Sequence, residues 1–199
     1  MPISIPSTPN FVTSRFYLKN NTQVFISSLS NQIQRRNLTG SYWMAEYSLP
    51  PMSRSNWSAW QAFFNELQGR RNTFNGFCPD SKTTQGSATG TPLVNGSSQT
   101  GNSVITDGWT VSTAILKAGD FISFGGELKQ VSSDVSSDGS GNATITFQPT
   151  IRTSPSDNAP ITVNNTTCEM ILLGNDINFN IGVDGVSEPL TFAAMEVIS

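Results

Sequence analysis

The sequence contains no histidine, which removes the side chain that most often serves as a general base or as a metal ligand. Its two cysteines, Cys78 and Cys168, match neither the spacing of a zinc site nor a redox motif. Without histidine no Ser-His-Asp triad can form, and no serine lies in a Gly-x-Ser-x-Gly motif. We therefore expect no catalytic residue, no metal ligand and no cofactor-binding residue. For the cysteines, two reduced and buried thiols are favoured over a disulfide.

Charged residues are also scarce, at 13% of the 199 residues, whereas about a quarter is usual. Ser, Thr, Asn and Gly are abundant instead, as is typical of a β-rich protein with many turns. No apolar run approaches the ~20 residues that cross a membrane, so no membrane span is expected. The first ten residues lack the charged and apolar regions of a signal peptide.

The few charges are unevenly distributed along the chain. Up to Lys82 there are eight basic and three acidic residues, a net charge of +5, and the remainder has three basic and eleven acidic residues, a net charge of −8. Such a split indicates two differently charged surfaces. The basic surface of one copy could meet the acidic surface of the next copy or of a partner, or the split could be only a difference between two modules. The arginines are scattered and no recognised motif surrounds them, so no specific nucleic-acid binding is expected.

The stretch of residues 42–80 predicts a strand, a helix and a second strand, and the rest of the chain is organised around it. Its first eight residues are rich in aromatics and alternate in part, and two prolines then end the strand. A helix is expected over about residues 53–68, with Ser53 or Ser55 as its N-cap and Gly69 as its left-handed C-terminal residue. Apolar side chains at i, i+3, i+4 and i+7 predict one buried stripe, made of Trp60, Phe63, Phe64 and Leu67.

Three strands are expected before this stretch. Residues 14–18 and 23–26 predict a hairpin around a turn at residues 19–22. An edge strand follows, on which Arg35 and Arg36 protect the edge or pair outward.

The composition changes sharply after the first eighty residues. Residues 81–103 are rich in Gly, Ser and Thr and predict a linker, and residues 104–163 predict a small all-β domain with a hairpin at Gly125-Gly126. The strand that ends the chain is expected to return to the first sheet. The predicted fold is therefore mainly β: a β-sandwich or barrel of residues 1–80 plus 164–199, with one packed α-helix and an inserted small all-β domain.

Carboxylates and one tryptophan of the inserted domain are the remaining candidates for chemistry. Asp is expected at turns for structural reasons alone, so four nearby carboxylates predict turns rather than a hydrolytic pair. Trp109 is either a stacking residue for a carbohydrate or, as favoured, a core residue. The four carboxylates are Asp120, Glu127, Asp134 and Asp138.

Several short motifs of core and turn residues are distinctive in combination. They are LPPM (49–52), AWQAF (59–63), LQGR (67–70), FCPD (77–80), LKAGDFI (116–122), GNATITFQP (141–149) and AAME (193–196). Over most of the chain they resemble structural proteins of long-tailed bacteriophages, and most closely the distal tail or baseplate hub family. Tube and tube-terminator proteins have related β-sandwich cores, so the station along the tail stays open.

The resemblance implies a virion protein, made in the host cytoplasm, that forms a ring on the end of the tail tube. The ring is usually a hexamer, contacts the tube protein and the tip or hub protein, and turns its inserted domain outward. The basic residues expected at contacts between copies are Arg35, Arg36, Arg70 and Arg71, with simple solvation as the alternative. A receptor- or carbohydrate-binding tail module is the second hypothesis. A cell-wall-degrading enzyme is disfavoured because no catalytic group is expected.

Overall fold

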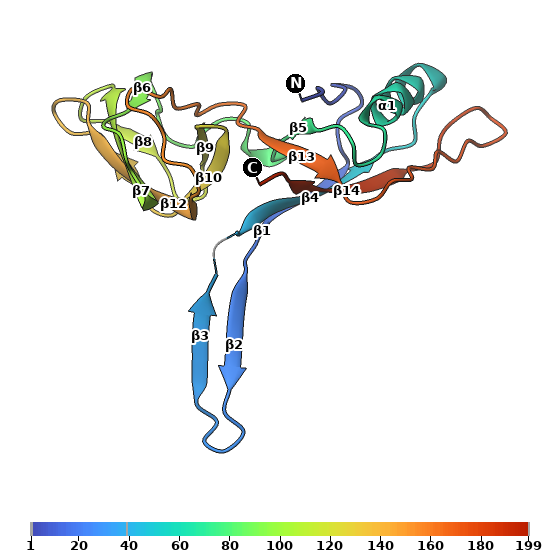
Figure 1. Ribbon diagram of the computed structural model, residues 1–199. Coiled ribbons are helices and arrows are strands. Elements are labelled where there is room, and N and C mark those ends of the chain that lie inside the picture. The colour runs from blue at the N-terminus through green and yellow to red at the C-terminus, as the bar shows by residue number, and fades with distance from the viewer. Residues whose placement is uncertain (1, 39, 199) are drawn as a thin grey trace.

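A computed structural model describes residues 2–38 and 40–198, and Figure 1 shows two domains side by side with a long hairpin projecting from them. The first domain is a five-stranded sheet with the single α-helix packed on one face. The second domain consists of the seven strands that lie between residues 90 and 151 in the sequence. The predicted mainly β class with one packed helix is confirmed.

The first sheet is antiparallel throughout, and its strands come from both ends of the chain. In spatial order they are β1 (Thr13–Lys19), β4 (Tyr42–Leu49), β14 (Leu190–Glu196), β13 (Cys168–Leu172) and β5 (Phe74–Gly76). The last strand of the chain therefore lies beside β4, as expected. A short 3-10 helix, Pro79–Ser81, follows β5 and leads toward the second domain.

Helix α1 (Arg54–Leu67) covers one face of this sheet because its apolar residues recur on one side. The stripe Trp60, Phe63, Phe64 and Leu67 is buried, and the Phe64 and Phe192 rings meet with centroids 5.0 Å apart. Burying each such side chain stabilises the fold by about 1.5–3 kcal/mol. Two end details differ from expectation: Ser53 is the N-cap but its side chain makes no capping bond, and Gln68 precedes Gly69 in the left-handed region.

The predicted hairpin of residues 14–18 and 23–26 is wrong, because these two strands do not pair with each other. They follow one another along the same side of a longer two-stranded ribbon. β1 pairs with β4, and β2 (Thr22–Ile26) pairs with β3 (Ile33–Asn37) beyond it. The Leu38 amide donates to the Asn21 carbonyl at 2.8 Å, so the ladder continues past the Asn-Asn pair that resembles a turn. The chain reverses instead at residues 27–32, where the Ser27 amide donates to the Gln32 carbonyl at 3.0 Å.

Part of the expected linker of residues 81–103 is also wrong, because it supplies one strand and the start of another. The second sheet has five strands in the order β6, β7, β12, β10, β9, and a separate pair β8–β11 lies beside it. Their bounds are β6 (Gly90–Val94), β7 (Gly101–Trp109), β8 (Ala114–Leu116), β9 (Phe121–Phe124), β10 (Glu127–Val131), β11 (Val135–Ser136) and β12 (Ala143–Ile151).

The second sheet curls until residues 159–162 bridge its two edge strands. The Val94 amide of β6 donates to the Ala159 carbonyl at 2.9 Å, and Ser123 of β9 exchanges two backbone hydrogen bonds with Thr162. The expected hairpin between β9 and β10 is present, with both Gly125 and Gly126 at positive φ as its tight turn requires. The second domain thus leaves neither β6 nor β9 as an open edge.

Changing Phe63 to Ala should lower the free energy of unfolding by roughly 3–5 kcal/mol, because the ring is 4% exposed and contacts Trp60, Phe64 and Phe74. Urea denaturation followed by tryptophan fluorescence measures the loss. The matched control is Glu66→Ala on the exposed side of α1, which should leave the midpoint nearly unchanged. An unchanged midpoint for Phe63→Ala would contradict this packing.

Candidate functional site

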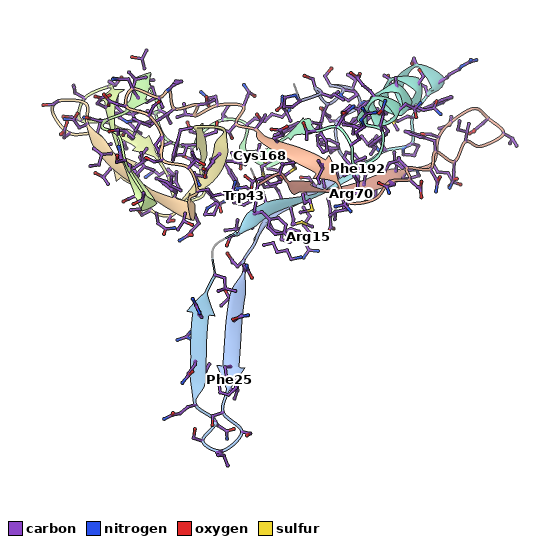
Figure 2. All side chains as sticks on the ribbon, viewed as in Figure 1. Arg15, Phe25, Trp43, Arg70, Cys168 and Phe192 are labelled. Carbon is purple, nitrogen blue, oxygen red and sulfur yellow. The ribbon has the colours of Figure 1, made fainter. Side chains whose placement is uncertain are left out.

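The β2–β3 hairpin carries a run of large apolar side chains that pack on neither core. It extends away from both domains in Figure 1, and the ring of Phe25 stands free near its tip in Figure 2. Every residue of β2 is exposed, and Phe25 retains 64% of its accessible surface. The exposed large apolar side chains of the hairpin are Val24, Phe25, Ile26, Leu29 and Ile33.

The hairpin presents different chemistry on its two faces, because residues paired across strands share a face. Val24 pairs with Arg35 and Ile26 with Ile33, which gives an apolar face with one cation. Phe25 pairs with Gln34 on the other face, where Arg36 also lies. Two isolated strands are only marginally stable in water, and both outer edges of this ribbon lack a strand partner within the described residues. Such an element is suited to contact another protein surface.

The predicted basic residues fall in two separate places. Arg35 and Arg36 are exposed on β3, whereas Arg70 and Arg71 are exposed just after α1 on the first domain. Arg71 donates to the side-chain oxygen of Gln68 at 2.8 Å. Figure 2 places Arg70 on the body of the molecule, well away from the hairpin. The structure therefore does not bring the four arginines together into one face.

Three of the four candidate carboxylates of the second domain are engaged in turns, as expected, whereas the fourth, Glu127, lies on strand β10. Asp120 is buried and accepts from the amides of Lys117 and Gln85, at 2.8 and 2.9 Å. Asp138 accepts from the amides of Ser140 and Asn142, both at 2.8 Å. Asp134 likewise caps a turn: it accepts from the Ala118 amide and pairs with the Lys117 ammonium. The hydrogen bonds that the Asn142 and Ser140 amides donate to Asp138 lower the pKa of its carboxyl.

Trp109 is a core residue, so its reading as a carbohydrate-stacking residue is wrong. Its side chain is 4% exposed, and the indole N–H donates to the Thr106 hydroxyl at 2.7 Å. The cysteines are both free thiols in this structure. Cys168 is buried, and burial raises the pKa of its thiol, which keeps it protonated and unreactive.

A junction between the two domains is the second notable site, and it begins with apolar contacts. Trp43, at the start of β4, packs against Phe121 of β9 with ring centroids 5.3 Å apart, and Phe16 of β1 stacks on the same indole. The Trp43 indole N–H donates to the Leu128 carbonyl of β10 at 2.9 Å. Phe121 and Leu128 thus belong to the core of the first domain although they lie in the second.

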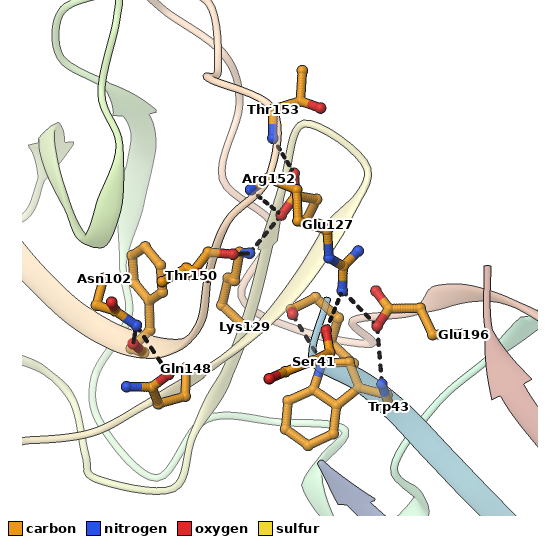
Figure 3. Close-up of polar contacts among 12 residues, drawn as sticks. Ser41, Trp43, Asn102, Glu127, Lys129, Gln148, Thr150, Arg152, Thr153 and Glu196 are labelled. Carbon is orange, nitrogen blue, oxygen red and sulfur yellow. Dashed lines mark hydrogen bonds and ion pairs between the residues drawn. The ribbon is translucent and has the colours of Figure 1, made fainter. Parts of the chain in front are cut away.

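Ion pairs complete this junction, as Figure 3 shows. The Arg152 guanidinium donates to the Glu196 carboxylate at 2.7 Å, and the same carboxylate oxygen accepts the Trp43 amide at 3.0 Å. Beside it, the Lys129 ammonium donates to Glu127 at 2.5 Å and to the Thr150 carbonyl at 2.8 Å. The side chain of Lys129 is fully buried and that of Glu196 almost so.

Burial acts on both partners of the Glu127–Lys129 pair. Burial opposes ionisation of Glu127, but the Lys129 ammonium and the amides of Thr153 and Arg152 outweigh it and lower the pKa of this carboxyl. For Lys129 burial is the larger effect, and it lowers the pKa of the ammonium despite the Glu127 partner. Sequence reasoning missed this pair, although opposite charges two residues apart on a strand necessarily share one face.

Changing Glu196 to Ala should lower the free energy of unfolding by roughly 3–5 kcal/mol, because it leaves the largely buried Arg152 guanidinium without its carboxylate. Chemical denaturation measures the loss. The matched control is Glu188→Ala, an exposed carboxylate of the first domain, which should change little. Combining Glu196→Ala with Arg152→Met should recover part of the loss; full additivity of the two changes would show that the residues are not coupled.

The Glu127 carboxyl should make stability depend on pH in a defined direction. Its pKa is lower in the folded than in the unfolded chain, so its contribution is present above the ordinary value of about 4.3 and is lost as the pH falls through the folded value. Glu127→Gln should therefore be less stable than wild type near neutral pH and approach it in acid. Urea midpoints across this range test the trend; a difference that stays constant with pH would contradict it.

Among the described residues, no group of three or more His, Cys, Asp or Glu side chains is arranged to hold a metal ion. No helix in the described part of the chain is long and apolar enough to cross a membrane. No protein-family model matches the chain, and no curated protein matches it.

Proposed function

We propose that this protein is a structural subunit of a bacteriophage tail that assembles into a closed ring at the distal end of the tail tube. In this role it joins the tube protein to the tip or hub proteins and performs no catalysis. The resemblance of its motifs to distal tail proteins supplies the assignment to a tail. The observation that carries the proposed assembly is the projecting β2–β3 hairpin with its unburied apolar residues.

The hairpin supports assembly because its apolar side chains would leave water only when another surface covers them. Val24, Ile26 and Ile33 share one face and are each more than half exposed. Covering each of them would stabilise a contact by about 1.5–3 kcal/mol. A neighbouring copy can supply the cover, since a ring joins one surface of each subunit to a different surface of the next.

The first sheet offers the second surface that such a contact needs. At one edge, β5 is covered by the N-terminal segment, where Asn75 donates its amide to the Ile3 carbonyl. At the other edge, no strand of the described chain pairs with the outer side of β1. A hairpin that adds to this edge would continue the sheet from copy to copy and satisfy the free backbone groups.

In such a ring the second domain would keep a fixed orientation relative to the first domain. The Trp43, Glu196 and Arg152 contacts join it to the end of the first sheet, so the two domains are expected to move as one unit. The resemblance implies a hexamer in which this domain faces outward. Tube and tube-terminator stations are alternatives within the same proposal, because a contact hairpin serves any of the three.

The proposed role of charge differs from the sequence-based expectation. Residues 164–199 return to the first domain, so residues 1–80 plus 164–199 carry seven basic and eight acidic residues, and residues 81–163 carry four and six. The two domains are therefore nearly balanced, at −1 and −2. The local basic element is the hairpin, whose Arg35 and Arg36 have no acidic neighbour between residues 20 and 38. Arg70 and Arg71 stay as secondary candidates for contacts.

Changing Val24, Ile26 and Ile33 together to Ser should weaken the ring by roughly three orders of magnitude, at about 1.5 kcal/mol for each apolar side chain removed from the interface. The fold should persist because all three side chains are exposed. Light scattering gives the mass at equal protein concentration, and electron microscopy gives the ring order. Arg35→Glu with Arg36→Glu, in the same assay, should weaken the ring less and alter its salt dependence.

The matched control for this experiment is Val111→Ser, which removes an equally exposed valine from the second domain and should leave the mass unchanged. Rings that form as before with the triple variant would exclude the hairpin as the contact. A wild-type protein that stays monomeric both alone and on the virion would exclude the ring itself.

A further inference from the structure

Half of the residues that line a groove between α1 and the segment of residues 175–180 carry amide side chains. It consists of two adjoining hollows of about 440 and 270 Å³ that share Phe64, Asn65, Ile177 and Asn178. Gln61 and Asn180 line one end, and Gln68 and Asn175 line the other.

The segment that forms one wall belongs to a long connection that the sheet itself does not require. β13 and β14 are antiparallel neighbours, which a turn of two residues can join, yet residues 173–189 lie between them. In Figure 1 this connection extends beyond the end of the sheet, on the side of α1. Connections of this length inside a compact domain are uncommon and usually carry a function.

The wall is held against the helix by specific contacts. Ile177 and Phe179 pack on the first core, and the Phe179 ring lies 5.9 Å from that of Phe64. Asn175 lies against Gly69 so closely that a Cβ there would come within 3.3 Å of its backbone. The groove is therefore built by packing on both sides and is not an open gap beside a free loop.

The side chains in the groove match the surface of a sugar. Four side chains in the groove make no side-chain hydrogen bond within the described residues, and each carboxamide offers both a donor and an acceptor. They are Gln61, Asn65, Asn175 and Asn178. Sugar hydroxyls need that combination. The half-buried Phe179 ring adds an apolar face beside them, and aromatic walls with a few polar groups are typical of small-ligand sites.

Charge in the groove favours a neutral ligand. Among the residues that line the two hollows, Asp176 alone carries a charge, and its carboxylate would repel an anionic ligand. Asp176 lines the groove, where a carboxylate can accept from two hydroxyls at once. We propose that this groove binds a neutral oligosaccharide, independently of whether the chain assembles into a ring.

Saturation-transfer NMR and calorimetric titration of the full chain with maltotriose and with triacetylchitotriose test the proposal. We expect saturable binding of at least one probe, with one site per chain. Asn65→Ala combined with Asn178→Ala should weaken it by about tenfold or more, as for the loss of two hydrogen-bonding groups. Phe179→Ala should also weaken it, and urea denaturation of each variant checks that it remains folded.

The matched control is Asn95→Ala, which removes an exposed asparagine of the second domain and should leave binding unchanged. No saturable binding of either probe by the wild-type protein would overturn the proposal. Binding that the double variant retains at full strength would also overturn it, because the sugar would then lie elsewhere. If the double variant instead changes the mass in light scattering while no sugar binds, the groove is a contact between copies.

Discussion

The buried carboxylate of Glu196 ties together three distant parts of the chain, and the relation between the two domains depends on it. It accepts the backbone amide of Trp43 at the start of β4 and the guanidinium of Arg152 from the second domain. A charge taken out of water in this way is tolerated only with its partners in place, so removing one of them is strongly destabilising. The Trp43 indole adds a directional bond to the Leu128 carbonyl, and Phe121 fills the space beside it. Together these contacts admit one orientation of the second domain and penalise others, because any rotation would leave buried polar groups unpaired.

The β2–β3 hairpin, unlike the junction, extends away from both domains instead of holding them together (Figure 1). Its strands contribute nothing to either apolar core, and its stability as an isolated ribbon is marginal. A chain that needed only to fold would gain nothing from keeping Val24, Phe25, Ile26 and Ile33 in water at the end of a projecting arm. The first sheet, α1 and the junction between the domains stabilise the fold, whereas the hairpin leaves apolar surface exposed that the fold does not use. Because of this separation, we expect that changes in the arm leave the fold intact.

The sequence alone predicted the structure correctly where apolar residues recur with the period of a helix over several turns. The spacing of Trp60, Phe63, Phe64 and Leu67 predicted the buried face of α1, because one helical stripe can only meet the sheet in one way. The hairpin was misread because Asn20-Asn21 has turn chemistry, although the ladder runs past it. β6 was hidden in a Gly/Ser/Thr-rich segment, since a short edge strand containing proline gives little pattern. The Arg152–Glu196 pair joins residues 44 apart in sequence, and no local signal connects them. The groove beside α1 depends likewise on how a loop packs, which composition does not determine.

The ion pairs also determine which charges are left for other molecules. All three cations after Lys82 have a carboxylate partner: Lys117 with Asp134, Lys129 with Glu127, and Arg152 with Glu196. Any unpaired positive charge among the described residues must therefore come from the first part of the chain. There Arg15 has Glu46 at 3.7 Å, while Arg35 and Arg36 form no ion pair and lie on an arm that extends away from the acids of both domains. Their own molecule cannot neutralise them, so their field is available to steer an approaching acidic surface and to set its orientation. The apolar residues beside them on the same hairpin would then hold the contact that the charges align.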